Sequence, residues 1–278
     1  MLPTKTPTQM IDTHCHINMM VKKDFDVALQ EQEIKDAAII LCQAADNQVT
    51  RIINVGTSLI ESQNCIQLAQ AYDTVFATVG IHPNDCTSSW QDDFKLIQEM
   101  VKKKELNRIV GIGETGLDRH YPDYNLKRQQ DAFKAQIELS LEHDIALVVH
   151  TRDARDETLR SLEEFKGQIT RGIIHCFSED QDFANQVIEW QFCLGIGGTI
   201  TYPKNLYLRD IVCATSLDQM VLETDAPYLP PQIVRGKQNH PLYIATIAEY
   251  IATLKDESLD LVAAKTTNNA CRIFNINV

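Results

Sequence analysis

The sequence predicts a protein of the α/β class, a single (β/α)8 TIM barrel, and three observations support this fold. Eight short apolar segments recur along the 278 residues, helical patterns separate them, and polar or ionisable residues repeatedly follow them. A repeat of about 35 residues is enough for a strand, a helix and their connections. No Gly-, Pro- or Ser-rich linker divides the chain, so we expect one domain over residues 1–278.

The eight expected strands are continuous apolar runs with many β-branched residues. Such runs are typical of parallel strands that are covered on both faces. They cover residues 10–13, 51–57, 75–83, 108–118, 145–153, 171–178, 192–199 and 220–227. An open doubly wound sheet is less well supported, because GxGxxG is absent and polar residues follow many strands rather than one switch point.

Helical patterns fill the intervals between these strands. They cover residues 58–71, 126–143, 154–165, 180–190, 241–254 and 258–274. Ser58 with Glu61 three positions later is a capping-box signal, and Pro241 suits the first turn of a helix. The long first crossover, residues 17–51, has room for an additional helix.

Composition limits the class of protein. The net charge is −12 and 44% of the residues are hydrophobic, which is typical of globular proteins. No apolar run reaches the roughly 18–20 residues of a membrane span, and the first ten residues lack the apolar region of a signal peptide. Eight cysteines without a CxxC pair are expected to be free thiols, so we expect a cytoplasmic protein.

The negative charge also bears on nucleic acid. A groove lined with Lys and Arg that follows duplex DNA is disfavoured. Nucleic acid as such is not excluded, since bound metal ions would add positive charge locally.

Ionisable residues coincide with the ends of several expected strands. His14 and His16 follow the first strand and, two residues apart, point the same way. In a barrel, all such residues lie at the C-terminal mouth, where these enzymes build their sites. The full set is His14, His16, Glu114, His150, His175 and Asp225. Imidazole and carboxylate groups gathered in this way predict a metal site.

The number of donors predicts two ions. Four imidazoles and two carboxylates exceed the needs of one tetrahedral ion that keeps a position open. They suit two divalent ions that share a carboxylate, an arrangement used in phosphoryl transfer. Nitrogen and oxygen donors fit Mg, Mn, Zn or similar ions, and the residues do not choose among them.

Several motifs, in this order along nearly the whole chain, resemble a known family. They are IDTHCHI (11–17), VGIHP (79–83), GIGETGLD (111–118), IIHCFS (173–178), LETDAPYLPP (222–231) and RGKQNHP (235–241). The chain resembles the TatD-type metal-dependent deoxyribonucleases, a branch of the amidohydrolase-like TIM barrels.

The resemblance implies a role for each ligand. His14, His16 and Asp225 would hold the first ion, His150 and His175 the second, and Glu114 would bridge them. It also implies hydrolysis of DNA phosphodiester bonds, as a 3′-5′ exonuclease on single strands. DNA ends or short single-stranded DNA would be the substrate, with no membrane and no obligate protein partner. Departures from the family pattern, such as Asn18 and Thr151, bear on substrate preference.

We hypothesise that a metal-bound hydroxide attacks the phosphorus of a terminal phosphodiester. By resemblance, Asp225 would orient the attacking water and accept its proton, with Glu114 as the second catalytic carboxylate.

Four further residues are candidate substrate contacts. His82 would contact a phosphate or support a ligand, and the alternative is a histidine satisfied within its loop. Arg152, two residues after His150, would clamp a phosphate, and the alternative is a salt bridge at the rim. Arg235 and Asn239 match the family's RGKxNxP loop, where a purely structural role is the alternative.

Two other functions remain open from the sequence. The same site would suit an amidohydrolase-type esterase, a lactonase or an aminoacyl-ester hydrolase, because fold does not fix the substrate. A non-enzymatic, metal-loaded scaffold is the second alternative, and the complete set of six ligands argues against it.

Overall fold

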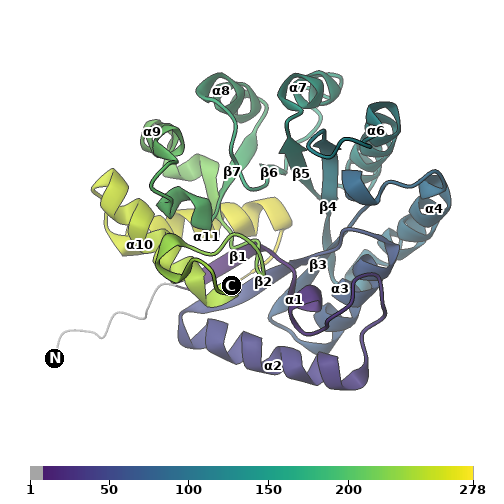
Figure 1. Ribbon diagram of the computed structural model, residues 1–278, viewed down its shortest axis with the longest axis horizontal. Coiled ribbons are helices and arrows are strands. Elements are labelled where there is room, and N and C mark those ends of the chain that lie inside the picture. The colour runs from purple at the N-terminus through teal and green to yellow at the C-terminus, as the bar shows by residue number, and fades with distance from the viewer. Residues whose placement is uncertain (1–8, 278) are drawn as a thin grey trace.

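The computed structural model describes residues 9–277 and contains the predicted barrel. Eight parallel strands form one sheet in the order of the chain, and helices lie around the outside of the strands (Figure 1). The strands are β1 Met10–Cys15, β2 Val49–Val55, β3 Val75–Val79, β4 Ile109–Asp118, β5 Ala146–Arg152, β6 Gly172–Ile174, β7 Phe192–Ile196 and β8 Met220–Leu222. Each overlaps one of the eight predicted strands.

The helices follow the strands in alternation. They are α1 Ile17–Met20, α2 Glu31–Asp46, α3 Leu59–Ala71, α4 Trp90–Val101, α5 Lys104–Asn107, α6 Leu126–His143, α7 Arg155–Glu163, α8 Gln181–Glu189, α9 Leu206–Ala214, α10 Ile244–Lys255 and α11 Leu259–Phe274. The first crossover carries α1 and α2, as its length predicts. Residues 241–243 form a 3-10 turn, so α10 begins later than the position of Pro241 predicts.

Two findings bear on other predictions from composition. None of the helices within residues 9–277 has the length and apolar character that crossing a membrane requires. All eight cysteines are free, as predicted. The prediction that the chain starts without a signal peptide concerns the first ten residues. Residues 1–8 of these lie outside the described residues.

Apolar side chains pack on both faces of the sheet, which explains the continuous apolar runs. The larger cluster lies between the strands and the helices. A second cluster fills the barrel interior and includes Ile53, Val148 and Val221. Ile273 and Phe274, from the last turn of α11, join this inner cluster.

The ring closes between β8 and β1 at the level of the candidate site. Cys15 and Ala226 form an isolated parallel bridge. His16 N donates to Ala226 O at 2.8 Å, and Asp225 N donates to His14 O at 2.8 Å. The backbone that closes the barrel therefore fixes the HxH segment against Asp225.

The start of α3 differs from the predicted capping box. Ser58 Oγ accepts a hydrogen bond from Glu61 N, which is half of the motif. The carboxylate of Glu61 instead faces the first crossover, where Lys22 Nζ donates to it at 2.6 Å. Both side chains are at most 3% exposed. A buried ion pair has therefore replaced the second half of the box.

This ion pair is part of a network that holds the loop between α1 and α2. Three further donors bind the carboxylate of Glu61: Asn18 Nδ2 at 2.8 Å, Asn64 Nδ2 at 3.0 Å and the backbone N of Asp26 at 2.8 Å. Burial would raise the pKa of Glu61, but these donors and Lys22 lower it below the ordinary 4.5. The network stabilises the fold above pH 4.5, and this stabilisation is lost as the pH falls further.

Lys22→Met is expected to lower the free energy of unfolding by about 3 kcal/mol, because it leaves a buried carboxylate without its cation. The remaining donors keep the loss at the lower end of the range for a broken buried pair. Urea denaturation at pH 7 measures this value. The double variant Lys22→Met/Glu61→Gln has no charge at either position. It is expected to regain part of the lost free energy of unfolding. A single variant as stable as the wild type would contradict the assignment.

Candidate metal centre

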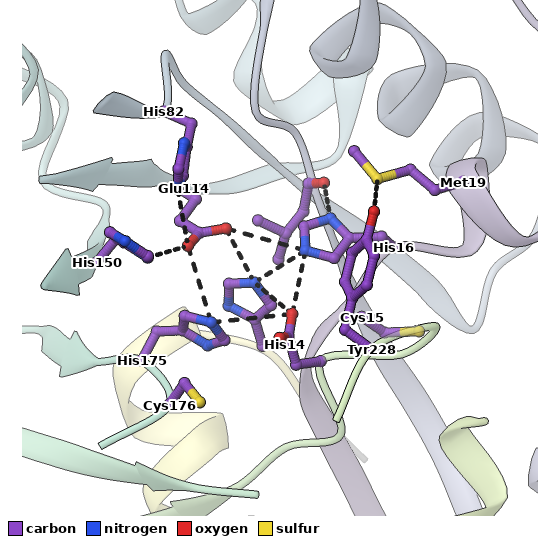
Figure 2. A network of polar contacts seen from close by, with 12 residues as sticks. His14, Cys15, His16, Met19, His82, Glu114, His150, His175, Cys176 and Tyr228 are labelled. Atoms are coloured by element: carbon purple, nitrogen blue, oxygen red, sulfur yellow. Dashed lines mark hydrogen bonds and ion pairs between the residues drawn. The ribbon is translucent and has the colours of Figure 1, made fainter. Parts of the chain in front are cut away.

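The structure brings all six predicted ligand side chains to one point at the C-terminal mouth of the barrel. Glu114 lies in the middle, with histidines from several strands pointing toward it (Figure 2). The inward-facing positions of the strands explain this convergence. In β5, Val148 belongs to the inner core and His150 follows two residues later. Ile173 in β6 and His175, directly after the end of β6, repeat this spacing.

Glu114 reaches the centre from an irregular part of β4. The register of β4 against β5 shifts between Ile112 and Thr115. Gly113 and Gly116 have φ values of +143° and +147°, and a Cβ at Gly116 would lie 1.9 Å from His150 O. Glycine is therefore required on both sides of the Glu114 segment, which explains the GxGETG pattern.

One group of donors surrounds the Oε2 atom of Glu114. It lies 3.3 Å from His14 Nε2 and 3.9 Å from His16 Nε2. The two Nε2 atoms are 3.2 Å apart, and Asp225 Oδ1 lies 3.4 Å from His16 Nε2 and 3.8 Å from His14 Nε2. These are the three residues expected at the first ion, together with one oxygen of the expected bridge.

A second group of donors faces the other carboxylate oxygen. Glu114 Oε1 lies 2.8 Å from His150 Nδ1 and 3.8 Å from His175 Nε2. Asp225 Oδ1 lies 3.9 Å from His175 Nε2, between the two groups. Glu114 thus presents one oxygen to each pair of histidines.

The donor chemistry fits a cation at the first group. Val55 O can only accept, so His16 Nδ1, 2.8 Å away, carries a proton. In the neutral ring the Nε2 atom therefore presents its lone pair to Glu114 and Asp225. Lone pairs of buried oxygen and nitrogen atoms that face one another at these distances need a positive charge between them. A divalent ion or protons would supply it, and metal binding would therefore release protons.

The pKa values show the same electrostatics in the metal-free chain. Burial would lower the pKa of His175, but the carboxylates of Glu223, Glu114 and Asp225 raise it to about 10. Burial would raise the pKa of Glu114, but His175, His14 and His82 hold it well below its usual range. The centre therefore keeps the carboxylate of Glu114 ionised and places it close to a cationic His175.

Three acidic residues that the sequence reasoning did not assign lie behind the ligands. Glu223 Oε1 lies 3.0 Å from His175 Nδ1. The two groups form a close ion pair, but their geometry is not that of a hydrogen bond. Asp12 Oδ1 accepts from His14 N at 3.2 Å and from Thr224 N at 3.0 Å, which links β1 to the segment after β8. Asp118 Oδ2 lies 3.2 Å from His150 Nε2.

These residues had usable signals in the sequence. Glu223 lies two residues before Asp225 in an extended segment, the spacing that identifies His14 and His16 as a pair. Asp118 ends the GETGLD motif. A carboxylate behind a histidine ligand fixes the tautomer of the ring and raises its basicity.

Glu223→Gln is expected to weaken divalent metal binding about 10- to 100-fold, the usual cost of losing such a partner. Isothermal titration calorimetry with Mn²⁺ or Zn²⁺ measures this affinity directly. Asp218→Asn is a matched control, because Asp218 pairs with Lys265 on the surface. Equal affinities for Glu223→Gln and the wild type would contradict the role.

A cavity of about 680 Å³ opens over the centre, and two of the four predicted substrate contacts line it, His82 and Arg152. Asn84 N donates to His82 Nδ1 at 3.1 Å, so the neutral ring carries its proton on Nε2, which lies 3.7 Å from Glu114 Oε1. Burial and the neighbouring His150 lower the pKa of His82 to about 3, so the ring is neutral.

Arg152 forms no ion pair within residues 9–277, so the structure does not contain the rim salt bridge that was its alternative. Its guanidinium carbon lies 6.0 Å from the ring centroid of Tyr121. The guanidinium therefore keeps its hydrogen-bond donors available at the edge of the cavity.

The structure does not place Arg235 and Asn239 as substrate contacts. Neither lines the cavity over the centre. Arg235 stacks on Tyr202, with 4.3 Å from guanidinium carbon to ring centroid. Asn239 is buried, and its Nδ2 donates to Thr224 O at 2.7 Å and to Tyr228 O at 2.6 Å. Its amide satisfies the loop backbone, which is the structural role that was the alternative for Asn239.

A family profile described as TatD related DNase matches residues 11–275. The chain belongs to this family. It is therefore a metal-dependent hydrolase with a TIM-barrel fold, as the motifs predict.

Relatives of this TatD-family chain carry consistent names. YcfH of Escherichia coli K12, named as an uncharacterized metal-dependent hydrolase, is 33% identical over 268 residues, covering 96% of each chain. A protein of Citrobacter rodentium named 3′-5′ ssDNA/RNA exonuclease TatD is 30% identical over 262 residues, covering 91% of this chain and 98% of its own. The crystal structure of YjjV, a TatD homologue from Escherichia coli K12, superposes with a TM-score of 0.87 at 27% identity and covers 97% of this chain and 99% of its own.

Proposed function

We propose that this hydrolase cleaves phosphodiester bonds at the ends of single-stranded DNA, as a 3′-5′ exonuclease that uses two divalent ions. One observation carries the proposal: the two oxygens of Glu114 face separate groups of histidines. This arrangement supports two adjacent cation sites that share a carboxylate. Paired ions of this kind suit phosphoryl transfer. The exonuclease polarity is taken from the name of the Citrobacter rodentium relative.

The ligand sets are those that the family resemblance implies, and the distances around Glu114 are compatible with them. We assign His14, His16 and Asp225 to one ion and His150 and His175 to the other, with Glu114 between them. When bound, the ions lower the pKa of water and neutralise the charge of the phosphate. Because the chain is acidic overall, at −12, we expect substrate affinity to depend strongly on bound metal.

Asp225 is placed to accept a proton from the attacking water. Its side chain is 14% exposed, so it reaches the cavity. Burial would raise its pKa, but His16, His175 and His14 lower it, which keeps the carboxylate ionised. An ionised carboxylate between the two donor groups can orient a water and take its proton.

His82 and Arg152 are placed to hold the phosphate. His82 presents an N–H, fixed by the backbone of Asn84, toward the centre. Arg152, which forms no ion pair among residues 9–277, presents its guanidinium at the cavity edge, where it suits two oxygens of one phosphate. Together they would stabilise the negative charge that develops on the phosphoryl oxygens.

Parallel assays test the proposal against its rival. The purified enzyme, with Mg²⁺, Mn²⁺, Zn²⁺ or Co²⁺, is given 3′-labelled and 5′-labelled single-stranded DNA, the matching duplex, and a panel of carboxylic esters, lactones and amides. We expect stepwise shortening of single strands from the 3′ end. Hydrolysis of the ester or amide panel with intact DNA would assign the site to carbonyl chemistry instead.

A further inference from the structure

A second, polar cavity of about 550 Å³ adjoins the cavity over the metal centre. The two cavities share Asn84 and Tyr121 as lining residues. Asn84 is fixed in place, because its Nδ2 donates to Asp118 Oδ2 at 3.0 Å. The other lining residues come from the loop after β3, the loop between β4 and α6, and the first turn of α6. Tyr121 therefore lies at the boundary between the two cavities.

Two aromatic rings that line the second cavity are exposed and also contact neighbouring side chains. Tyr121 is 50% exposed and Tyr124 is 37% exposed, and both line the second cavity. Arg119 lies over the ring of Tyr124, 5.7 Å from its centroid, and also pairs with Glu157 at 2.8 Å. Arg119 N donates to Arg152 O at 3.0 Å, which ties this loop to β5.

Exposed aromatic rings beside guanidinium groups are the means by which proteins hold unpaired bases. Arg152 and Arg119 place positive charge next to Tyr121 and Tyr124. Stacking accepts any base, since every base has an aromatic face. A base that is paired in a duplex is not free to enter a cavity of this kind.

We propose that the second cavity binds the nucleoside next to the scissile phosphodiester, with its base stacked on Tyr121. This rests on the proposed function, because a DNA strand that lies in the catalytic cavity continues into a neighbouring nucleoside. A small ester or lactone has no base to stack on Tyr121. The second cavity therefore supports an oligonucleotide as the substrate class, and this subsite would favour single strands over duplex DNA.

The test combines a change in the protein with a change in the substrate. Tyr121→Ala and Tyr121→Phe are compared with the wild type on short single-stranded DNA, with either a normal or an abasic residue beside the terminal nucleotide. Tyr207→Ala is the matched control, because Tyr207 is 45% exposed and lines neither cavity. KM and kcat are measured for cleavage, and Kd is measured by fluorescence anisotropy with phosphorothioate strands that resist hydrolysis.

For normal DNA, Tyr121→Ala is expected to raise KM and Kd about 5- to 150-fold, with a smaller change in kcat. The abasic residue is expected to weaken wild-type binding to a similar extent and to have little further effect on Tyr121→Ala. Tyr121→Phe, which keeps the ring, and Tyr207→Ala should retain wild-type values. Equal penalties from Tyr121→Ala on normal and abasic strands would overturn the subsite.

The outcomes separate this inference from the proposed function. If the wild type binds single strands but cleaves none, the nuclease proposal fails, while the anisotropy comparison still decides the subsite. If the wild type cleaves DNA and Tyr121→Ala has unchanged KM and Kd, only the subsite fails. A wild type that neither binds nor cleaves single strands overturns both.

Discussion

Asp225→Asn is expected to lower kcat for DNA cleavage about 10²- to 10⁴-fold, the usual contribution of a general base. The reason is its position: Oδ1 lies 3.4 Å from His16 Nε2 and 3.9 Å from His175 Nε2, so it contacts both donor groups and reaches the cavity. Asparagine keeps the shape of the side chain but loses the charge that takes up a proton. The ligands His150 and His175 are untouched, so one ion should still bind.

The measurement is kcat at saturating metal, with the metal content determined on the same sample. Asp85→Asn is the matched control, since Asp85 is an exposed acid that lines the same cavity and contacts none of the six ligands. We expect the control to keep wild-type turnover. Near-normal kcat in Asp225→Asn with metal replete would remove Asp225 from the mechanism.

Glu114→Gln is expected to have the broader effect, because it removes an anionic oxygen from both donor groups at once. The loss in metal affinity should exceed the 10- to 100-fold expected for Glu223→Gln, which acts only through His175. Activity should fall with the metal content. The amide also leaves His14 and His150 without the carboxylate that each faces, at 3.3 Å and 2.8 Å.

Equilibrium dialysis followed by elemental analysis measures this loss as ions per chain. A thermal melt of the metal-free protein controls for folding, and Glu223→Gln is the comparison variant. A Glu114→Gln protein that retains two ions per chain would contradict the bridging role.

The strand periodicity explains why the metal centre could be predicted from the sequence. Ligands such as His150 and His175 continue an inward-facing series that begins with buried apolar residues, and two-residue spacing keeps the side chains on one face. Parallel strands of a barrel then bring these faces together at one end. Local periodicity and topology were therefore sufficient to predict that these six side chains lie together.

Other features depend on contacts between segments far apart in the chain. Glu61 has the spacing of a capping box, but the buried Lys22 from the first crossover binds its carboxylate instead. Asn239 matches a family motif, yet backbone carbonyls 11 and 15 residues away occupy its amide. The proposed stacking role of Tyr121 carries no signal in the sequence, because it depends on the position of Tyr121 where two cavities meet.

The central claim is that the six side chains hold two ions and that these ions enable cleavage of single-stranded DNA. The most direct measurement adds Mn²⁺, Mg²⁺, Zn²⁺ or Co²⁺ stepwise to chelator-treated protein and records bound ions per chain together with the rate of DNA cleavage. We expect no cleavage without metal and full activity as binding approaches two ions per chain. Fewer than one bound ion per chain, with no DNA cleavage under any of the four metals, would contradict it.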